Sequence, residues 1–242
     1  MDEPSIVPGS RSTGGRLPLS LLSGLGADRR LFAPQRAVFD NLVTPDWITP
    51  DDGDTLASYA QKMARAVDPH GPCFVGGISM GGMIALEMTR HLDARACFLI
   101  SSIRSGRELP PRLRALRPLA FLAPVAFAAA LLFAHAALKI GGPWLSPLRR
   151  SLFEQFTATQ RAFLCWASRA ILCWQPGYGE ISVPVLHIHG DRDHLLPARF
   201  TRPDVLVPGG GHLLTLTHPD AVNAFLRDGM ARFGQIGTEG GT

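Results

Sequence analysis

The sequence lacks several features that would point to particular classes of protein. Its four cysteines include no CxxC pair, and Cys73 and Cys97 fall inside apolar runs, so we expect buried free thiols. No long basic run interleaved with aromatic side chains is present, so we expect no nucleic-acid partner despite a formal net charge of +4. The start, MDEPSIVPGS, has no apolar core of a secretory signal, which favours a cytoplasmic location.

What the sequence does have is enough apolar content, 46% over 242 residues, to form the core of one large domain. Short apolar runs alternate with segments of helical periodicity. We expect strands at LPLSLL, CFVGGI, ACFLISSI, PVLHIHG and DVLVPGG, and helices at 55–67, behind a Thr55 N-cap, 80–92 and 221–233. This alternation predicts an α/β fold with a mostly parallel sheet flanked by helices.

The alternation stops between Arg104 and about residue 176. Five arginines, a long Ala/Leu/Phe run and the helix-like stretch SLFEQFTATQRAFLCWASRAILCW predict a helical cap over the carboxyl edge of the sheet. The expected division of the chain is a core of residues 17–103 and 177–233, a cap of residues 104–176, a flexible leader at 1–16 and a flexible tail at 234–242.

Residues 118–138 of the cap contain no Lys, Arg, Asp or Glu and are long enough to cross a bilayer. Nine alanines, together with Pro124 and His135, argue against a membrane-spanning helix. We therefore expect this run to line an apolar pocket, with Phe127 and Phe133 among the lining side chains. Contact of the cap with a membrane surface is the alternative.

A serine between two pairs of glycines marks the candidate active site. Gly77-Ile78-Ser79-Met80-Gly81 matches G-x-S-x-G, follows an apolar strand and opens a helix. In such a turn the serine backbone is strained, and a Cβ at Gly77 or Gly81 would collide with a neighbouring element. The free N–H groups of the helix start would face negative charge that develops during acyl transfer. The alternative is a glycine-rich turn with an incidental serine.

Together with this motif, four further stretches make the chain resemble the α/β-hydrolase family from Leu17 to Phe233. These stretches are LLSGLGADRRLF, LISSIRSGRELP, HIHGDRDHLLP and GGGHLL. Within the family, the chain is similar to the small cytosolic carboxylesterases of the pimeloyl-carrier-protein methyl ester esterase kind. The resemblance implies an α/β-hydrolase fold with a helical cap insertion, and chemistry without a metal or organic cofactor.

Carried over by position, the resemblance implies Ser79 as the nucleophile, Asp193 as the acid and His212 as the base. A serine hydroxyl needs a histidine to take its proton, and that histidine needs a carboxylate to fix its tautomer. Asp191 is the rival acid, because it lies two residues from Asp193 on the same loop. It directly follows Gly190, where it is better placed to bond loop amides.

The resemblance also implies an oxyanion hole made by the backbone N–H groups of Leu25 and Met80, beside Gly24 of the first loop. Many relatives have His-Gly where this chain has Ser23-Gly24. The usual side-chain support of this loop is therefore absent, and we expect serine to support it differently.

The segment HIHGDRDH also approaches the metal-binding pattern H-x-H-x-D-H. The register fails, because Arg192 follows Asp191 and His194 comes one residue late. We therefore expect no metal site, and we expect His187 and His189 to be hydrogen-bonded histidines of the core or its rim.

The sequence thus predicts a serine hydrolase that cleaves a carboxylic ester through an acyl-enzyme intermediate. Its substrate would be a small-molecule or acyl-carrier-linked ester. A thioesterase or C–C hydrolase with the same triad stays open, as does a binding module that keeps the fold without turnover. The oligomeric state and the two halves of the ester have no readable signature in the sequence.

Overall fold

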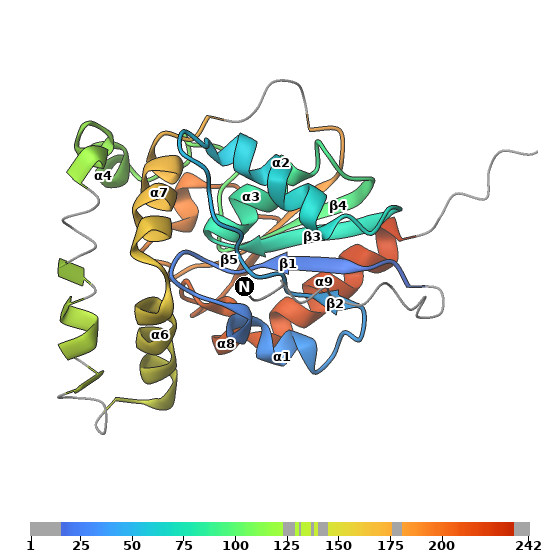
Figure 1. Cartoon of the computed structure of the whole chain (residues 1–242). Coiled ribbons are helices and arrows are strands. Elements are labelled where there is room, and N and C mark those ends of the chain that lie inside the picture. The colour runs from blue at the N-terminus through green and yellow to red at the C-terminus, as the bar shows by residue number, and fades with distance from the viewer. Residues whose placement is uncertain are drawn as a thin grey trace, which may run out of the picture.

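A six-stranded parallel sheet forms the centre of the molecule in the computed structural model, which describes residues 16–122, 129–130, 132–136, 138–139, 145–175 and 181–234 (Figure 1). The strands are β1 (Leu19–Leu22), β2 (Leu42–Val43), β3 (Cys73–Ile78), β4 (Ala94–Ile100), β5 (Val185–Gly190) and β6 (Val205–Val207). Every neighbouring pair is parallel, in the order β2-β1-β3-β4-β5-β6. The predicted α/β fold is confirmed.

The order of the strands reverses between β1 and β3, since β2 lies on one side of β1 and all later strands lie on the other. In open parallel sheets, ligands bind outside the carboxyl ends of the strands at such a reversal. Ser23 and Gly24 follow the end of β1, and Ser79 follows the end of β3. The predicted first loop and the predicted serine turn therefore meet at the point where this fold binds ligands.

Helices cover both faces of the sheet (Figure 1). On one face lie α2 (Leu56–Val67) and α3 (Met80–Met88), and on the other lie η1 (Arg29–Phe32), α1 (Ala33–Arg36), α8 (Leu214–Thr217) and α9 (Pro219–Phe233). Each face has its own apolar cluster, and β1 contributes Leu22 to one and Leu19 and Leu21 to the other. This division follows from the alternation of side chains along a strand.

Local sequence accounts for the start of α2. The Thr55 side chain accepts the Ser58 N–H at 3.1 Å, and the Ser58 hydroxyl accepts the Thr55 N–H at 3.0 Å. This reciprocal capping satisfies two backbone donors that would otherwise lack partners at the helix start. The predicted N-cap at Thr55 is confirmed, and the predicted helical periodicity buries Tyr59 and Met63.

Between β4 and β5 the chain leaves the sheet and forms further helices beside it (Figure 1). They include α4 (Pro111–Arg114), η2 (Arg117–Leu122), α6 (Pro147–Ala158) and α7 (Arg161–Leu172). The long helix-like stretch of the sequence is two helices, because the backbone is extended at Thr159 and Gln160. In the part of the chain that is described, no helix is both long and apolar enough to cross a membrane.

Several sequence predictions fall outside the described residues, namely Phe127 and nearly all of the leader and tail. The four cysteines are all free thiols. Cys73 and Cys97 are buried in β3 and β4 as expected, whereas Cys173 is exposed at the end of α7. The expectation of burial was wrong for Cys173, because the amphipathic α7 ends there and the residue follows its last turn.

Candidate active site

Ser79 occupies the turn between β3 and α3 in a backbone conformation that non-glycine residues rarely adopt, with φ 55° and ψ −121°. Its N–H donates to the Ile100 carbonyl at 3.0 Å, and its own carbonyl accepts the Ser102 hydroxyl at 2.7 Å. Strain of this kind persists only where the surroundings hold it in place. Here β4 and the residues that follow it hold the turn from one side.

Glycine is required around this serine for steric reasons. A Cβ on Gly77 would lie 2.5 Å from the carbonyl carbon of Gly81, and one on Gly81 would run into the carbonyls of Leu22 and Ser23. The crowding that we expected at both positions is therefore present. Gly76 is equally constrained, since its Cβ would lie 2.5 Å from the Phe98 carbonyl oxygen. Sequence reasoning missed this third site, although the Gly76-Gly77 pair inside an apolar strand was a signal.

Asp193 and His212 come together from the loops that follow β5 and β6. Nδ1 of His212 lies 2.7 Å from Oδ2 of Asp193, and Oδ1 accepts the N–H groups of Leu195 and Leu196 at 2.8 and 2.9 Å. Burial alone would raise the pKa of the Asp193 carboxyl, but hydrogen bonds from His189 and His212 hold it well below its usual range. The carboxylate is thus ionised and accepts a hydrogen bond from His212 Nδ1–H.

Asp191 takes no part in this pair. Its side chain is exposed, and its Oδ1 accepts the Gly209 N–H at 2.8 Å. This is the bonding to a loop amide that the sequence led us to expect. The structure therefore brings Asp193, and not its rival, against His212.

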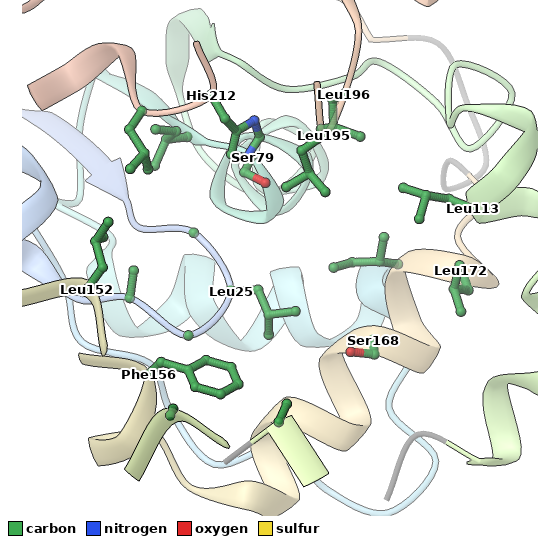
Figure 2. Close-up of a pocket in the computed structure, with 18 of the residues that line it drawn as sticks. Leu25, Ser79, Leu113, Leu152, Phe156, Ser168, Leu172, Leu195, Leu196 and His212 are labelled. Carbon is green, nitrogen blue, oxygen red and sulfur yellow. The ribbon is translucent and has the colours of Figure 1, made fainter. Parts of the chain in front are cut away.

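Ser79 and His212 line the same cavity, and Figure 2 shows the two side chains together. They and Asp193 all lie on segments that follow the carboxyl ends of parallel strands. A histidine whose Nδ1–H is held by a carboxylate has Nε2 left to take a proton from a hydroxyl. The arrangement is suited to activating a serine nucleophile.

The first loop is supported by its own serine. The buried Ser23 hydroxyl donates to the Ala27 carbonyl at 3.0 Å, and the Ala27 N–H donates to the Gly24 carbonyl at 3.2 Å. Gly26 closes this turn with φ 71°, in a region that favours glycine. Leu25 stands at the middle of the turn and lines the cavity.

The two predicted oxyanion donors lie on segments next to Ser79, namely the start of α3 and the loop that follows β1. Met80 is the first residue of α3, so its N–H has no partner within the helix. The first loop lies against the serine, because a Cβ on Gly24 would be 3.7 Å from the Ser79 Cβ. This contact places the Leu25 turn next to the Ser79 side chain.

The cavity that contains Ser79 has a volume of about 1270 Å³. Its lining is mostly leucine, phenylalanine and alanine, and Arg149 and His212 are its only ionisable residues among those described. Phe133 lines it, as the sequence predicted. In Figure 2, lining side chains of α6 lie on one side of Ser79 and those of α4 and α7 on the other: Leu152, Phe156, Leu113 and Leu172.

Two of the three histidines of the HIHGDRDH segment, His187 and His189, are core residues, fully buried on β5. Nε2 of His187 lies 2.9 Å from Nδ1 of His189. Among the described residues, no group of three or more His, Cys, Asp or Glu side chains is arranged to hold a metal ion. Sequence reasoning missed that Nε2 of His189 also lies 3.2 Å from Oδ2 of Asp193.

Comparison with known proteins identifies the family. A model of the Alpha/beta hydrolase family matches residues 7–225. The chain belongs to this family. Members of this family are generally hydrolytic enzymes, and their fold carries many activities, so the particular reaction has to be argued from the site.

Solved structures share the fold of this hydrolase over most of its length. A thermophilic esterase from Thermogutta terrifontis is 19% identical with a TM-score of 0.70, and the match covers 92% of each chain. A hydrolase from Pseudomonas aeruginosa PA01 is 17% identical with a TM-score of 0.69, again over 92% of each chain. An enol-lactonase from Burkholderia xenovorans LB400 is 21% identical with a TM-score of 0.66, over 92% of this chain and 94% of its own.

One curated relative matches a short part of the sequence. Fifty residues are 42% identical to a part of the polyketide synthase PksR of Bacillus subtilis (strain 168). The match covers 21% of this hydrolase and 2% of that protein. It therefore carries no information about the activity of the whole chain.

Proposed function

We propose that this alpha/beta hydrolase is a serine esterase that cleaves a carboxylic ester through an acyl-enzyme. One observation carries the proposal. A histidine that a carboxylate holds at 2.7 Å lines the same cavity as a serine on a strained strand-to-helix turn. The same three residue types in the same roles recur on several unrelated folds that transfer acyl groups to serine.

In the proposed reaction, Ser79 Oγ attacks the ester carbonyl carbon while His212 Nε2 takes the hydroxyl proton. Asp193 stabilises the imidazolium that results. The N–H groups of Leu25 and Met80 bind the oxyanion of the tetrahedral intermediate. The intermediate collapses, and His212 gives its proton to the leaving alkoxide, which departs as the alcohol.

A water molecule then replaces the alcohol. His212 takes a proton from the water as its oxygen attacks the acyl-enzyme carbonyl. Collapse of the second tetrahedral intermediate releases the carboxylic acid, and the proton on His212 returns to Ser79 Oγ. Each proton is thus returned, and the cycle needs no metal or organic cofactor.

The cavity favours substrates with a substantial apolar part. Its lining is apolar on both sides of Ser79 (Figure 2), and its volume of about 1270 Å³ exceeds the roughly 300–1,000 Å³ usual for ligand pockets. We propose an apolar ester as substrate, either a small molecule or an acyl group linked to a carrier. An esterase and a lactonase among the solved structures of this fold support ester chemistry. The particular similarity to pimeloyl-carrier-protein methyl ester esterases and the cytoplasmic location stay predictions.

The proposal is tested with a fluorophosphonate probe and p-nitrophenyl esters of increasing chain length. We expect labelling and turnover by the wild type, with kcat/KM rising from acetate to longer acyl groups, and neither in Ser79→Ala. A folded wild type that is neither labelled nor active would favour a binding module. Faster cleavage of a thioester than of the matched oxygen ester would favour the thioesterase alternative.

A further inference from the structure

A continuous chain of side chains runs from the base of the cap to the proposed catalytic acid. It begins at Arg104, passes through His187 and His189 on β5, and ends at Asp193. Both histidines are fully buried. They face the same side of the strand because they are two residues apart. Two buried histidines in contact are costly unless each ring nitrogen has a partner, so the hydrogen-bond roles can be worked out.

The contacts of His189, at the inner end of this chain of side chains, determine which of its ring nitrogens carries a proton. Nε2 of His189 lies 2.7 Å from the Leu196 carbonyl oxygen and 3.2 Å from Oδ2 of Asp193. Both oxygens can only accept, since the Asp193 carboxyl is ionised. His189 therefore carries a proton on Nε2. In a neutral ring, Nδ1 of His189 then accepts a hydrogen bond from Nε2–H of His187, and these two nitrogens lie 2.9 Å apart.

The outer end of the chain agrees with this direction. Nη1 of Arg104 lies 3.4 Å from Nδ1 of His187, and a guanidinium can only donate. Burial lowers the pKa of His187 to about 3, and the electrostatic effects of His189 and of Arg104 act in the same direction, whereas a backbone hydrogen bond with Ser102 opposes them. His187 is thus a neutral ring at neutral pH.

Arg104 is itself held in place. Its guanidinium donates to the Arg202 carbonyl at 2.7 Å and to Asp204 at 3.4 Å, and Asp204 also accepts the His187 backbone N–H at 2.7 Å. The chain therefore starts from an anchored cation, and with Nδ1 of His187 as the acceptor every N–H in it points toward Asp193.

We propose that Arg104, His187 and His189 are positioning residues for the proposed acid. They hold a second side-chain donor against Oδ2 of Asp193, the same oxygen that accepts the His212 Nδ1–H. This inference rests on the proposed role of Asp193. It goes beyond the triad, since none of the three touches the ester.

The chemical effect follows from the sharing of one oxygen. Oδ1 of Asp193 is held by two backbone N–H groups, and Oδ2 by His212 at 2.7 Å and His189 at 3.2 Å. The second donor fixes the rotation of the carboxylate and withdraws charge from Oδ2. Without this donor, the orientation of the carboxylate is less well fixed. More negative charge also stays on Oδ2, so the carboxylate stabilises the His212 imidazolium more strongly.

The test compares His189→Phe, which removes the donor and keeps a ring of similar size, with His189→Gln, which keeps an N–H donor. We expect His189→Phe to lower kcat about 10- to 100-fold with little change in KM. The acidic limb of its kcat/KM profile should move about half a pH unit or more to higher pH. His189→Gln should recover part of both effects. The matched control is His218→Phe, because His218 contacts Thr217 and not Asp193, and its profile should be unchanged.

A purely structural role for His189 would lower the melting temperature and leave the acidic limb in place, and that result would overturn the inference. Failure of the proposed function looks different, since the wild type would then lack fluorophosphonate labelling, or its activity would survive Asp193→Asn. If Asp193→Asn removes the wild-type activity but a folded His189→Phe leaves it unchanged, only the proposed role of Arg104, His187 and His189 is rejected.

Nitrogen-15 NMR of the histidine rings tests the chain in the wild type, even if His189→Phe does not fold. We expect both His187 and His189 to be neutral at pH 7 with the proton on Nε2. A proton on Nδ1 of His187, donated to the backbone of Ser102, or a charged His189 would overturn the proposed direction. Arg104→Met, at the half-exposed outer end, should shift the His187 signals and lower kcat by a smaller factor; unchanged signals would remove Arg104 from the chain.

Discussion

The core and the predicted cap of this alpha/beta hydrolase differ in net charge and in how closely their atoms are packed. The predicted cap, residues 104–176, has ten basic and two acidic residues, a net charge of +8, whereas the rest of the chain has fourteen and eighteen, a net charge of −4. In the core, an added Cβ at Gly77 would meet backbone atoms 2.5 Å away. In the cap, lining residues such as Leu119 and Phe133 are 50% and 69% exposed. Atoms near Ser79 are thus fixed by contact, while the cap offers a broad apolar surface.

This difference predicts that core substitutions act on chemical steps with large effects, and that cap substitutions act on substrate choice with small ones. A close-packed backbone cannot move to accommodate a changed atom. A half-exposed apolar wall loses only part of one contact when a side chain changes.

The largest effect is expected at Asp193. Asp193→Asn keeps the shape of the side chain but favours the wrong tautomer of His212, a change that costs about 10⁴ in kcat in serine proteases. Asp191→Asn is the control and should lower mainly the melting temperature, because Asp191 bonds the Gly209 N–H. Both kcat and melting temperature are measured for each purified variant. The reverse pattern would transfer the acid role to Asp191 and would show that loop bonding was misread.

The first loop should give the next largest effect. In Gly24→Val, γ-methyl groups would press on Ser79 and displace the Leu25 N–H, at a cost of about 10²- to 10³-fold in kcat. Gly24→Ala is a matched control, because its Cβ would lie at an ordinary 3.7 Å from the Ser79 Cβ. Ser23→Ala should cost much less than Gly24→Val, since it removes only the bond to the Ala27 carbonyl. Equal losses in Ser23→Ala and Gly24→Val would give the Ser23 hydroxyl a direct part in catalysis.

The core should also be acid-sensitive through His187. Its pKa falls from 6.5 to about 3 on folding, mainly because it is buried, so between these values the unfolded chain binds one more proton. Stability therefore rises with pH across this window and is lost as pH falls, by up to about 1.4 kcal/mol per pH unit. Urea unfolding between pH 6.5 and 4.5 measures the slope, and His187→Gln should reduce it by about one proton. An unchanged slope would mean that His187 is protonated in the folded state.

The smallest effect is expected in the cap. Phe133→Asp should raise KM for long-chain esters about three- to tenfold and spare acetate esters, since about 1 kcal/mol of apolar contact is lost. Leu132→Asp is its control, because Leu132 is 74% exposed and does not line the cavity. KM is measured over a series of chain lengths. Equal effects of Phe133→Asp on all lengths, or an effect of Leu132→Asp as large, would contradict an acyl-binding role of the cavity wall.

Much of the core could be predicted because its signals are local. The apolar runs at β3, β4 and β5 are continuous since parallel strands are buried on both faces. The elbow glycines are predictable because a Cβ there meets atoms only a few residues away or on the adjacent strand. The helices of the predicted cap could not be predicted in this way. Helices α6 and α7 are separated at Thr159 and Gln160, where no glycine or proline marks an end.

The sequence by itself thus determined the order of five of the six strands and of the helices α2, α3 and α9, the place of Ser79 at a tight turn, and the residues available as acid and base. Only the tertiary structure decided which aspartate meets His212, how Ser23 supports the first loop, and that His189 reaches Asp193. The physical reason is the separation along the sequence over which each kind of interaction acts. Periodicity and glycine sterics act within one element, whereas Arg104 and His187 are 83 residues apart and meet only because β4 and β5 pair in the sheet.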